Sequence, residues 1–368
     1  MKKRNDPEKV PRVCFVLYAL AGVSAVFYLI FVNSARFADG FNDHISRWGR
    51  RLLGTLTAWF PFSLAELLLL LLPLILAVLV WRVVKIYSAN RRTVLAFLAR
   101  VGAAVCLVGI LFVWCFAPGY YGATLDRKLG LSRDPVSADD LYRTAVILAD
   151  AINPLADSLL VGADGSSVMP YSLNEMNEKL MKAYAAFTAD RDFPDHFRSR
   201  VKPVMLSHAM SYTHITGVYS FFTGEANINV AFPDYCIPFT AAHELAHQRG
   251  VAREDEANFV AFLICLSSDD PYLRYSGLLN VYEYVASALW SADRTLYRAA
   301  YARLADRVVA EERAYAAFYE RYRDNVAAAV SEKTNDIYLQ SQGSKAGSRS
   351  YDMVVDLAVA YYRADFTE

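Results

Sequence analysis

The sequence has no excess of either charge. Its 368 residues include 38 lysines and arginines and 38 aspartates and glutamates, so the formal net charge is zero. Proteins that bind nucleic acid through its phosphates carry a basic surface or a basic net charge. Nothing in the charge balance therefore indicates nucleic acid as a partner, and we expect none.

Cysteine is also scarce, and no two cysteines have Cys-x-x-Cys spacing. Of the five, Cys14, Cys106 and Cys115 fall inside apolar runs. This pattern excludes both a disulfide framework and a zinc site built from thiolates. Cys236 and Cys265 remain as a possible pair on an oxidising side of a membrane, but two buried free thiols are the favoured interpretation.

Long apolar runs are present, and all of them lie in the first third of the chain. Hydrophobic residues make up 55% of the sequence, and three runs of about twenty residues cover 13–32, 62–81 and 94–116. Each is long enough to cross a bilayer as a helix. No small-residue cleavage site follows the first run and further apolar runs come after it, which favours an anchor over a removed signal peptide. We therefore predict a membrane anchor over 1–117 with three transmembrane helices.

Basic residues indicate how this anchor is oriented. They precede the first run and fill the loop between the second and third, at Lys2, Lys3, Arg4, Arg82, Lys85, Arg91 and Arg92. Because cytoplasmic loops are enriched in lysine and arginine, we expect the N-terminus in the cytoplasm and residues 118–368 outside it. In the loop over 33–61, Phe41, Ile45, Trp48 and Leu52 follow a helical period, which predicts an amphipathic helix on the outer surface.

Residues 118–368 have the composition of a soluble domain and are mostly predicted as helix. Ser137 with Asp140, and Ser172 with Glu175, have the spacing of helix capping boxes. The stretch over 217–231 departs from the helical trend, because aromatic and β-branched residues surround a Thr-Gly turn signal. It predicts a β-hairpin or an edge strand. The expected fold class is thus mostly α, with three transmembrane helices followed by a mainly helical domain with a small β-hairpin or edge sheet.

The segment over 239–250, which reads FTAAHELAHQRG, carries the clearest chemical pattern. Positions i and i+4 share one face of a helix, so His243 and His247 can direct imidazole nitrogens at one cation, as a catalytic zinc requires. Glu244 lies beside that face, within reach of a bound water, and is the expected general base. Histidines that only satisfy core hydrogen bonds are the alternative. A purely structural zinc site would have no use for Glu244.

A zinc ion bound by two histidines needs a third protein ligand, and the next segment, EDEANFVAFL, offers Glu254 and Glu256. We favour Glu254, because Asn258 lies four residues further along the same helix face, where its amide can orient a ligating histidine. Glu256 remains the alternative.

At these residues the sequence resembles the gluzincins, zinc peptidases with His-Glu-x-x-His and a downstream Glu-x-x-x-Asp/Asn. The third histidine of the related metzincin pattern is replaced by Arg253. The sequence also resembles an uncharacterised family of bacterial membrane proteins, domain of unknown function 3810, through four segments: PFSLAE (61–66), FTGEANIN (222–229), HELAHQRGVAREDEANF (243–259) and GSRSYDMVVDL (347–357). These resemblances imply a multi-pass protein of the bacterial cell membrane with a gluzincin-like domain over 118–368, outside the cytoplasm.

The expected activity is zinc-dependent hydrolysis of peptide bonds in a peptide or protein near the bilayer surface. An extended substrate is expected to add to the predicted strand at Ala226, Asn227, Ile228 and Asn229, unless that strand only packs for stability. Tyr282, Tyr284 and His214 are candidates for stabilising the oxyanion. The rival hypothesis is a membrane-anchored binding or sensor protein that keeps the fold without catalysis.

Overall fold

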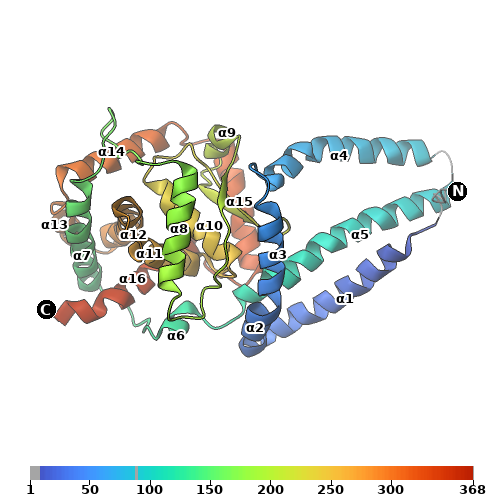
Figure 1. Ribbon diagram of the computed structural model, residues 1–368, viewed down its shortest axis with the longest axis horizontal. Helices are drawn as coiled ribbons and strands as arrows, with labels where there is room; N and C mark the ends of the chain where they lie inside the picture. Colours follow the sequence, from blue (N-terminus) through green and yellow to red (C-terminus); the bar gives the residue numbers. More distant parts are fainter. Residues whose placement is uncertain (1–8, 88–89, 368) are drawn as a thin grey trace. The chain divides into compact units, whose positions relative to one another are not determined.

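A computed structural model describes residues 9–87 and 90–367 (Figure 1). The basic residues Lys2, Lys3 and Arg4 lie outside this part. The chain divides into two compact units. Unit 1 comprises Met1–Gly122 and Ser220–Gly224, and unit 2 comprises Ala123–Tyr219 and Glu225–Glu368.

The helices of unit 1 are α1 (Arg12–Asn33), α2 (Ala35–Phe41), the π-helical turn η1 (Asn42–Ser46), α3 (Arg47–Thr57), α4 (Leu64–Tyr87), α5 (Arg91–Cys115) and the 3-10 turn η2 (Ala117–Tyr120). Three of them are long and apolar enough to cross a membrane, over Arg12–Asn33, Leu64–Lys85 and Arg91–Cys115, with mean hydropathies of 2.4, 2.8 and 2.4. The expectation of three such helices is confirmed, although α4 begins two residues after the predicted start and continues past the predicted end, with Pro73 inside it.

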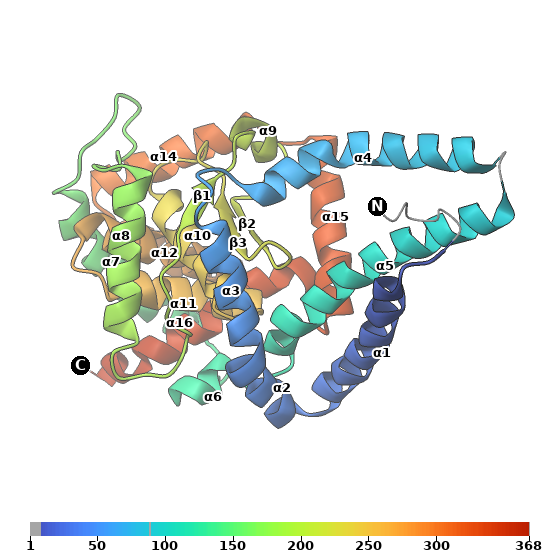
Figure 2. The same ribbon diagram turned by 45° about the vertical axis from the view of Figure 1, so that its right-hand side comes forward.

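The loop after the first long helix is itself helical, as its periodicity predicts. From Ala35 to Thr57, α2, η1 and α3 follow one another without a break. Both views show α3 near the ends of α1 and α5 (Figures 1 and 2). Ile45, Trp48 and Leu52 are exposed, but Phe41 is buried against the rings of α1 and α5.

The helices of unit 2 are α6 (Leu125–Leu129), α7 (Ala138–Ala156), α8 (Leu173–Phe187), α9 (Ser207–Ser211), α10 (Cys236–Gln248), α11 (Glu254–Leu266), α12 (Pro271–Ala292), α13 (Arg294–Tyr301), α14 (Asp306–Glu320), α15 (Val326–Ser341), η3 (Gly347–Met353), α16 (Val354–Tyr362) and η4 (Arg363–Thr367). Helix α12 packs on α7, α10, α11 and α16. All residues of α10 are buried, and so are all but the last of α11. The chemical pattern therefore lies on two core helices.

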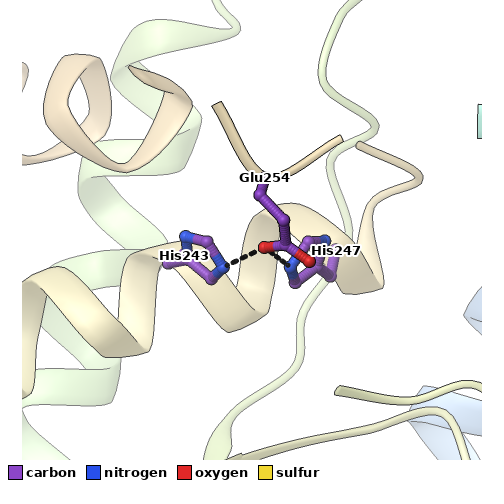
Figure 3. A group of neighbouring side chains, drawn as sticks. All are labelled: His243, His247 and Glu254. Atoms are coloured by element: carbon purple, nitrogen blue, oxygen red, sulfur yellow. Dashed lines mark hydrogen bonds and ion pairs between the residues drawn. The ribbon is translucent and has the colours of Figure 1, made fainter. Parts of the chain in front are cut away.

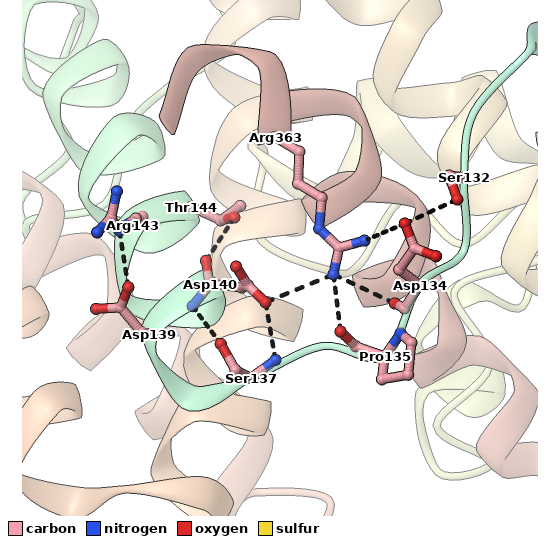
Figure 4. A network of polar contacts seen from close by, with 9 residues as sticks. All are labelled: Ser132, Asp134, Pro135, Ser137, Asp139, Asp140, Arg143, Thr144 and Arg363. Atoms are coloured by element: carbon pink, nitrogen blue, oxygen red, sulfur yellow. Dashed lines mark hydrogen bonds and ion pairs between the residues drawn. The ribbon is translucent and has the colours of Figure 1, made fainter. Parts of the chain in front are cut away.

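Both predicted capping boxes are present, at the starts of α7 and α8. Around the first of them, Arg363 donates hydrogen bonds to the carbonyl oxygen of Pro135 (2.8 Å) and to the carboxylate of Asp140 (3.5 Å), as Figure 4 shows. The Ser137 amide, aided by Arg363, lowers the pKa of Asp140. This network ties the C-terminal helix to the N-terminus of α7.

A small sheet completes unit 2, with strands β1 (Val201–Pro203), β2 (Gly217–Ser220) and β3 (Glu225–Ile228) in the order β1-β3-β2. The hairpin β2–β3 is present where the sequence predicted it, with Gly224 at φ 70° in the turn. The expected edge strand was wrong, because β3 lies in the centre and pairs in parallel with β1. Strand β1 has only three residues and ends at a proline, so no clear strand pattern predicts it.

Candidate metal centre

Helix α10 brings His243 and His247 together with Glu254 of α11 (Figure 3). The Nε2 atoms of both histidines lie 3.2 Å from the same Oε2 atom of Glu254. One ligand atom from each residue lies within 4.8 Å of the others, and all three side chains are buried. The three residues that the sequence singled out for the metal thus share one site.

The turn between α10 and α11 makes this arrangement possible. Gly250 has φ 93°, a left-handed conformation that side chains disfavour, and it directly follows the last turn of α10. The chain then reverses so that the carbonyl oxygen of Val251 lies 2.7 Å from Nδ1 of His247. Glu254 follows as the first residue of α11. The turn therefore both orients His247 and delivers the carboxylate.

Asn258 orients the other histidine, as its position on the helix predicted. Its Oδ1 atom lies 2.7 Å from Nδ1 of His243. With both Nδ1 atoms next to oxygen acceptors, both Nε2 atoms are left to face the carboxylate of Glu254. Two imidazole nitrogens and one carboxylate oxygen, with the histidines held from behind, are a donor set suited to zinc.

The alternative ligand, Glu256, points elsewhere. Its Oε1 atom accepts hydrogen bonds from the backbone N–H of Leu125 and from Arg253, each at 2.9 Å. The structure thus places Glu254 at the histidine pair and engages Glu256 in holding α6 against α11.

The charges of the site are strongly coupled. Burial disfavours ionisation of Glu254, but the two histidines outweigh burial and keep its pKa well below the usual range. Burial also lowers the pKa of His243, and the neighbouring His247 adds to this effect. For His247, the carboxylate of Glu254 outweighs burial and raises the pKa to about 9. A carboxylate that stays ionised beside imidazoles can bind a cation.

Glu244 lies next to this group without a partner of its own. Its Oε2 atom is buried and forms no hydrogen bond within the described residues, and burial raises the pKa of its carboxyl to about 8. The carboxylate lies against Gly217 of β2, where an added Cβ would come within 2.5 Å of Oε1. A buried carboxylate oxygen without a hydrogen bond is costly, so a hydrogen-bond donor bound beside Glu244 would stabilise it.

Tyr351 also lies at the site, although no sequence pattern predicted a role for it. Its ring lies 6.3 Å from that of His243, with the two planes within 18°. Burial and the charges of Glu254 and Glu244 raise the pKa of its hydroxyl well above the usual value, and the hydroxyl is hydrogen-bonded to Asn335. Tyr351 belongs to the GSRSYDM segment. About a hundred residues separate this segment from α10, so no local pattern predicts that the two are in contact.

The three oxyanion candidates lie in different surroundings. Tyr284 is connected to the site, because its hydroxyl accepts a hydrogen bond of 3.4 Å from Asn258. His214 has both ring nitrogens engaged, with the hydroxyl of Tyr319 at 2.8 Å and the carbonyl oxygen of Tyr322 at 2.7 Å. The hydroxyl of Tyr282 is buried and forms no hydrogen bond within the described residues, and burial, followed by the charge of Glu312, raises its pKa above the usual value.

The residues of the predicted substrate-binding strand are buried and hydrogen-bonded within the domain. Ala226, Asn227, Ile228 and Asn229 are all buried. The side chain of Asn227 donates to the carbonyl of Val218, and that of Asn229 donates to Ser211 and Ile215. Strand addition at these residues is therefore ruled out, since β3 is paired on both sides. The two cysteines left open by the sequence, Cys236 and Cys265, are both free and buried.

Comparison with known proteins gives one match. Neither the search of curated proteins nor that of solved structures gave a match. A family model described as "Protein of unknown function (DUF3810)" matches residues 41–359, which include both core helices of the site and the Tyr351 segment. The chain therefore belongs to the DUF3810 family.

Proposed function

We propose that the chain is a membrane-anchored, zinc-dependent metallopeptidase with a gluzincin-like domain over 118–368. The observation that carries this proposal is the convergence of His243, His247 and Glu254, with Glu244 beside them, whose buried Oε2 atom forms no hydrogen bond within the described residues. A site that only stored a metal would need no such carboxylate. When bound, zinc would supply an acidified water and polarise the scissile carbonyl.

In this mechanism Glu244 accepts the proton of the attacking water and passes it to the leaving amine. Burial raises the pKa of Glu244 to about 8 and so disfavours its charge, and the charge of a bound cation would stabilise the ionised form. Gly217 allows the carboxylate to sit against the backbone of β2. Asn258 and the carbonyl oxygen of Val251 keep the two imidazoles fixed throughout.

Tyr351 is proposed to donate a hydrogen bond to the oxyanion that forms on the substrate. Its raised pKa keeps the hydroxyl protonated at neutral pH, and a neutral donor near the developing charge stabilises it. Asn258 donates to the backbone carbonyl of Tyr351 at 3.3 Å, which connects the tyrosine to the same amide that orients His243.

The test is cleavage of a peptide library by the full-length protein in detergent. We expect Glu244→Gln to keep its zinc and to lose activity at least about a hundredfold, the usual contribution of a general base. Tyr351→Phe should lower kcat and leave the zinc content unchanged. The matched control is Tyr361→Phe, because Tyr361 is a partly exposed tyrosine on α16. Equal activity of wild type and Glu244→Gln would refute the mechanism. A zinc-loaded wild type that cleaves nothing would favour a binding or sensor protein.

The proposal includes an orientation, with the N-terminus in the cytoplasm and the site outside it. Its support is the basic charge where α4 ends and α5 begins, with Arg82 and Lys85 in the last turns of α4 and Arg91 and Arg92 in the first turn of α5. An alkaline phosphatase fused after Glu368 is expected to be active, since it needs an oxidising compartment to form its disulfides. An active cytoplasmic reporter at the same position would contradict the orientation.

A further inference from the structure

A cavity of about 490 Å³ lies within unit 1, where the first long helix ends. It is lined by Phe27 of α1 together with α2 and η1. Its apolar wall is made of packed rings: Phe27 lies 6.2 Å from Phe37 and 5.4 Å from Phe41, centroid to centroid. This volume is in the range of sites that bind small molecules.

The polar part of the lining consists of Ser34 and two basic side chains. Arg36 and His44 contribute to it, and the lining contains no acidic residue. Among the described residues, neither Arg36 nor His44 has a hydrogen-bond or ion-pair partner. An apolar wall with an arginine and an imidazole at its side matches a molecule that has hydrocarbon chains and an anionic head.

The helix geometry at the cavity is unusual. His44 and Ile45 belong to η1, a π-helical turn. Such turns are rare and frequently occur at functional sites. The turn also continues an exposed apolar face, because Ile45 is followed by Trp48, Leu52 and Leu56, all exposed. An amphipathic segment of this kind lies in the plane of the bilayer surface.

We propose that this cavity binds an anionic phospholipid of the surrounding bilayer. The acyl chain would pack on Phe27, Phe37 and Phe41, and Arg36 and His44 would bind the phosphate. The position fits this ligand, since α1 is one of the helices long enough to cross the membrane and Asn33 is its last residue. The inference does not depend on the proposed peptidase activity, and removal of zinc should leave it unchanged.

The sharpest test replaces a glycine with leucine, so that the new side chain fills the cavity. Gly40 lines the cavity, and a Cβ there meets no atom within 4 Å, so Gly40→Leu should fold and occupy the space. Gly109 of α5 is equally open but lies outside the lining, which makes Gly109→Leu the matched control. Arg36→Gln tests the charge, with Arg92→Gln at the other end of the long helices as its control.

The measurement is electron paramagnetic resonance of spin-labelled phosphatidylglycerol or phosphatidylcholine in nanodiscs that hold the full-length protein. Wild type should immobilise phosphatidylglycerol in preference to phosphatidylcholine. We expect Gly40→Leu to abolish this preference and Arg36→Gln to reduce it about fivefold, as for one lost basic charge at an anionic surface. Both controls should behave as wild type. Equal immobilisation of the two lipids by wild type, an unchanged Gly40→Leu, or an equal loss in Arg92→Gln would overturn the proposal.

Discussion

Removal of the hydrogen bond between Asn258 and His243 should weaken zinc binding by a predictable amount. The bond is 2.7 Å long and both side chains are buried, so Asn258→Leu leaves Nδ1 of His243 without an acceptor and its ring free to turn. Loss of such a partner behind a metal ligand typically costs 10–100-fold in affinity. That corresponds to about 1.4–2.7 kcal/mol of binding free energy.

Two further variants separate the hydrogen bond from simple packing. Asn258→Asp keeps an acceptor for His243 but loses the donor to the carbonyl of Tyr351, so its zinc affinity should remain close to that of wild type. Asn280→Leu is the control, because the side chain of Asn280 donates to the carbonyl of Ser276 in its own helix and has no other hydrogen bond within the described residues. The assay is competition with a chromogenic zinc chelator. If Asn258→Leu binds zinc as tightly as wild type, or if Asn258→Asp is as weak as Asn258→Leu, the described geometry does not hold the metal.

Three further predictions concern other parts of unit 2. Gly217→Ala should reduce kcat of peptide cleavage at least tenfold with full zinc content, because the new Cβ displaces the carboxylate of Glu244; unchanged kcat with full zinc would contradict this. Lys202→Met should lower the free energy of unfolding in a urea titration by about 3–5 kcal/mol, because it removes one partner of a buried ion pair; a loss below 1 kcal/mol would show that the pair is dispensable. Burial raises the pKa of Glu283 to about 8, so folding favours the protonated carboxyl. The free energy of unfolding that this carboxyl contributes is therefore lost as the pH rises from about 4.5 to 8, at about 1.4 kcal/mol per pH unit. Glu283→Gln should therefore flatten the fall of the melting temperature over this range, and an equally steep fall would refute the assignment.

The geometry around the histidines was largely predictable because it is local in sequence. Positions four apart share a helix face, so His243 with His247, and Glu254 with Asn258, follow from spacing alone once both segments are helical. The structure brings all four together. The choice of Glu254 over Glu256 followed from the same periodicity, and Glu256 is indeed engaged elsewhere.

What the sequence could not provide was contact across large separations. Gly217 and Tyr351 reach the site from β2 and η3, and no periodicity connects these elements to α10. The same limit explains the error over β3. The hairpin partner β2 is close in sequence and was recognised, whereas the parallel partner β1 is a short strand more than twenty residues upstream. A central strand was therefore mistaken for an edge.

In unit 1, composition alone predicted the three long apolar helices, since a run of about twenty predominantly apolar residues is long enough to cross a bilayer as a helix. Periodicity also predicted the amphipathic segment after α1. It did not predict that Phe41 would turn inward to pack on Phe27, because η1 changes the helical period at this point.

The central claim is a zinc ion bound by His243, His247 and Glu254, and elemental analysis of purified full-length protein tests it most directly. Wild type and Glu244→Ala should each contain about one zinc per chain, and so should Glu256→Ala, while His247→Ala and Glu254→Ala should contain almost none. The account would be contradicted if wild-type protein purified in the presence of zinc contained none. It would also be contradicted if the Glu254→Ala variant retained the metal.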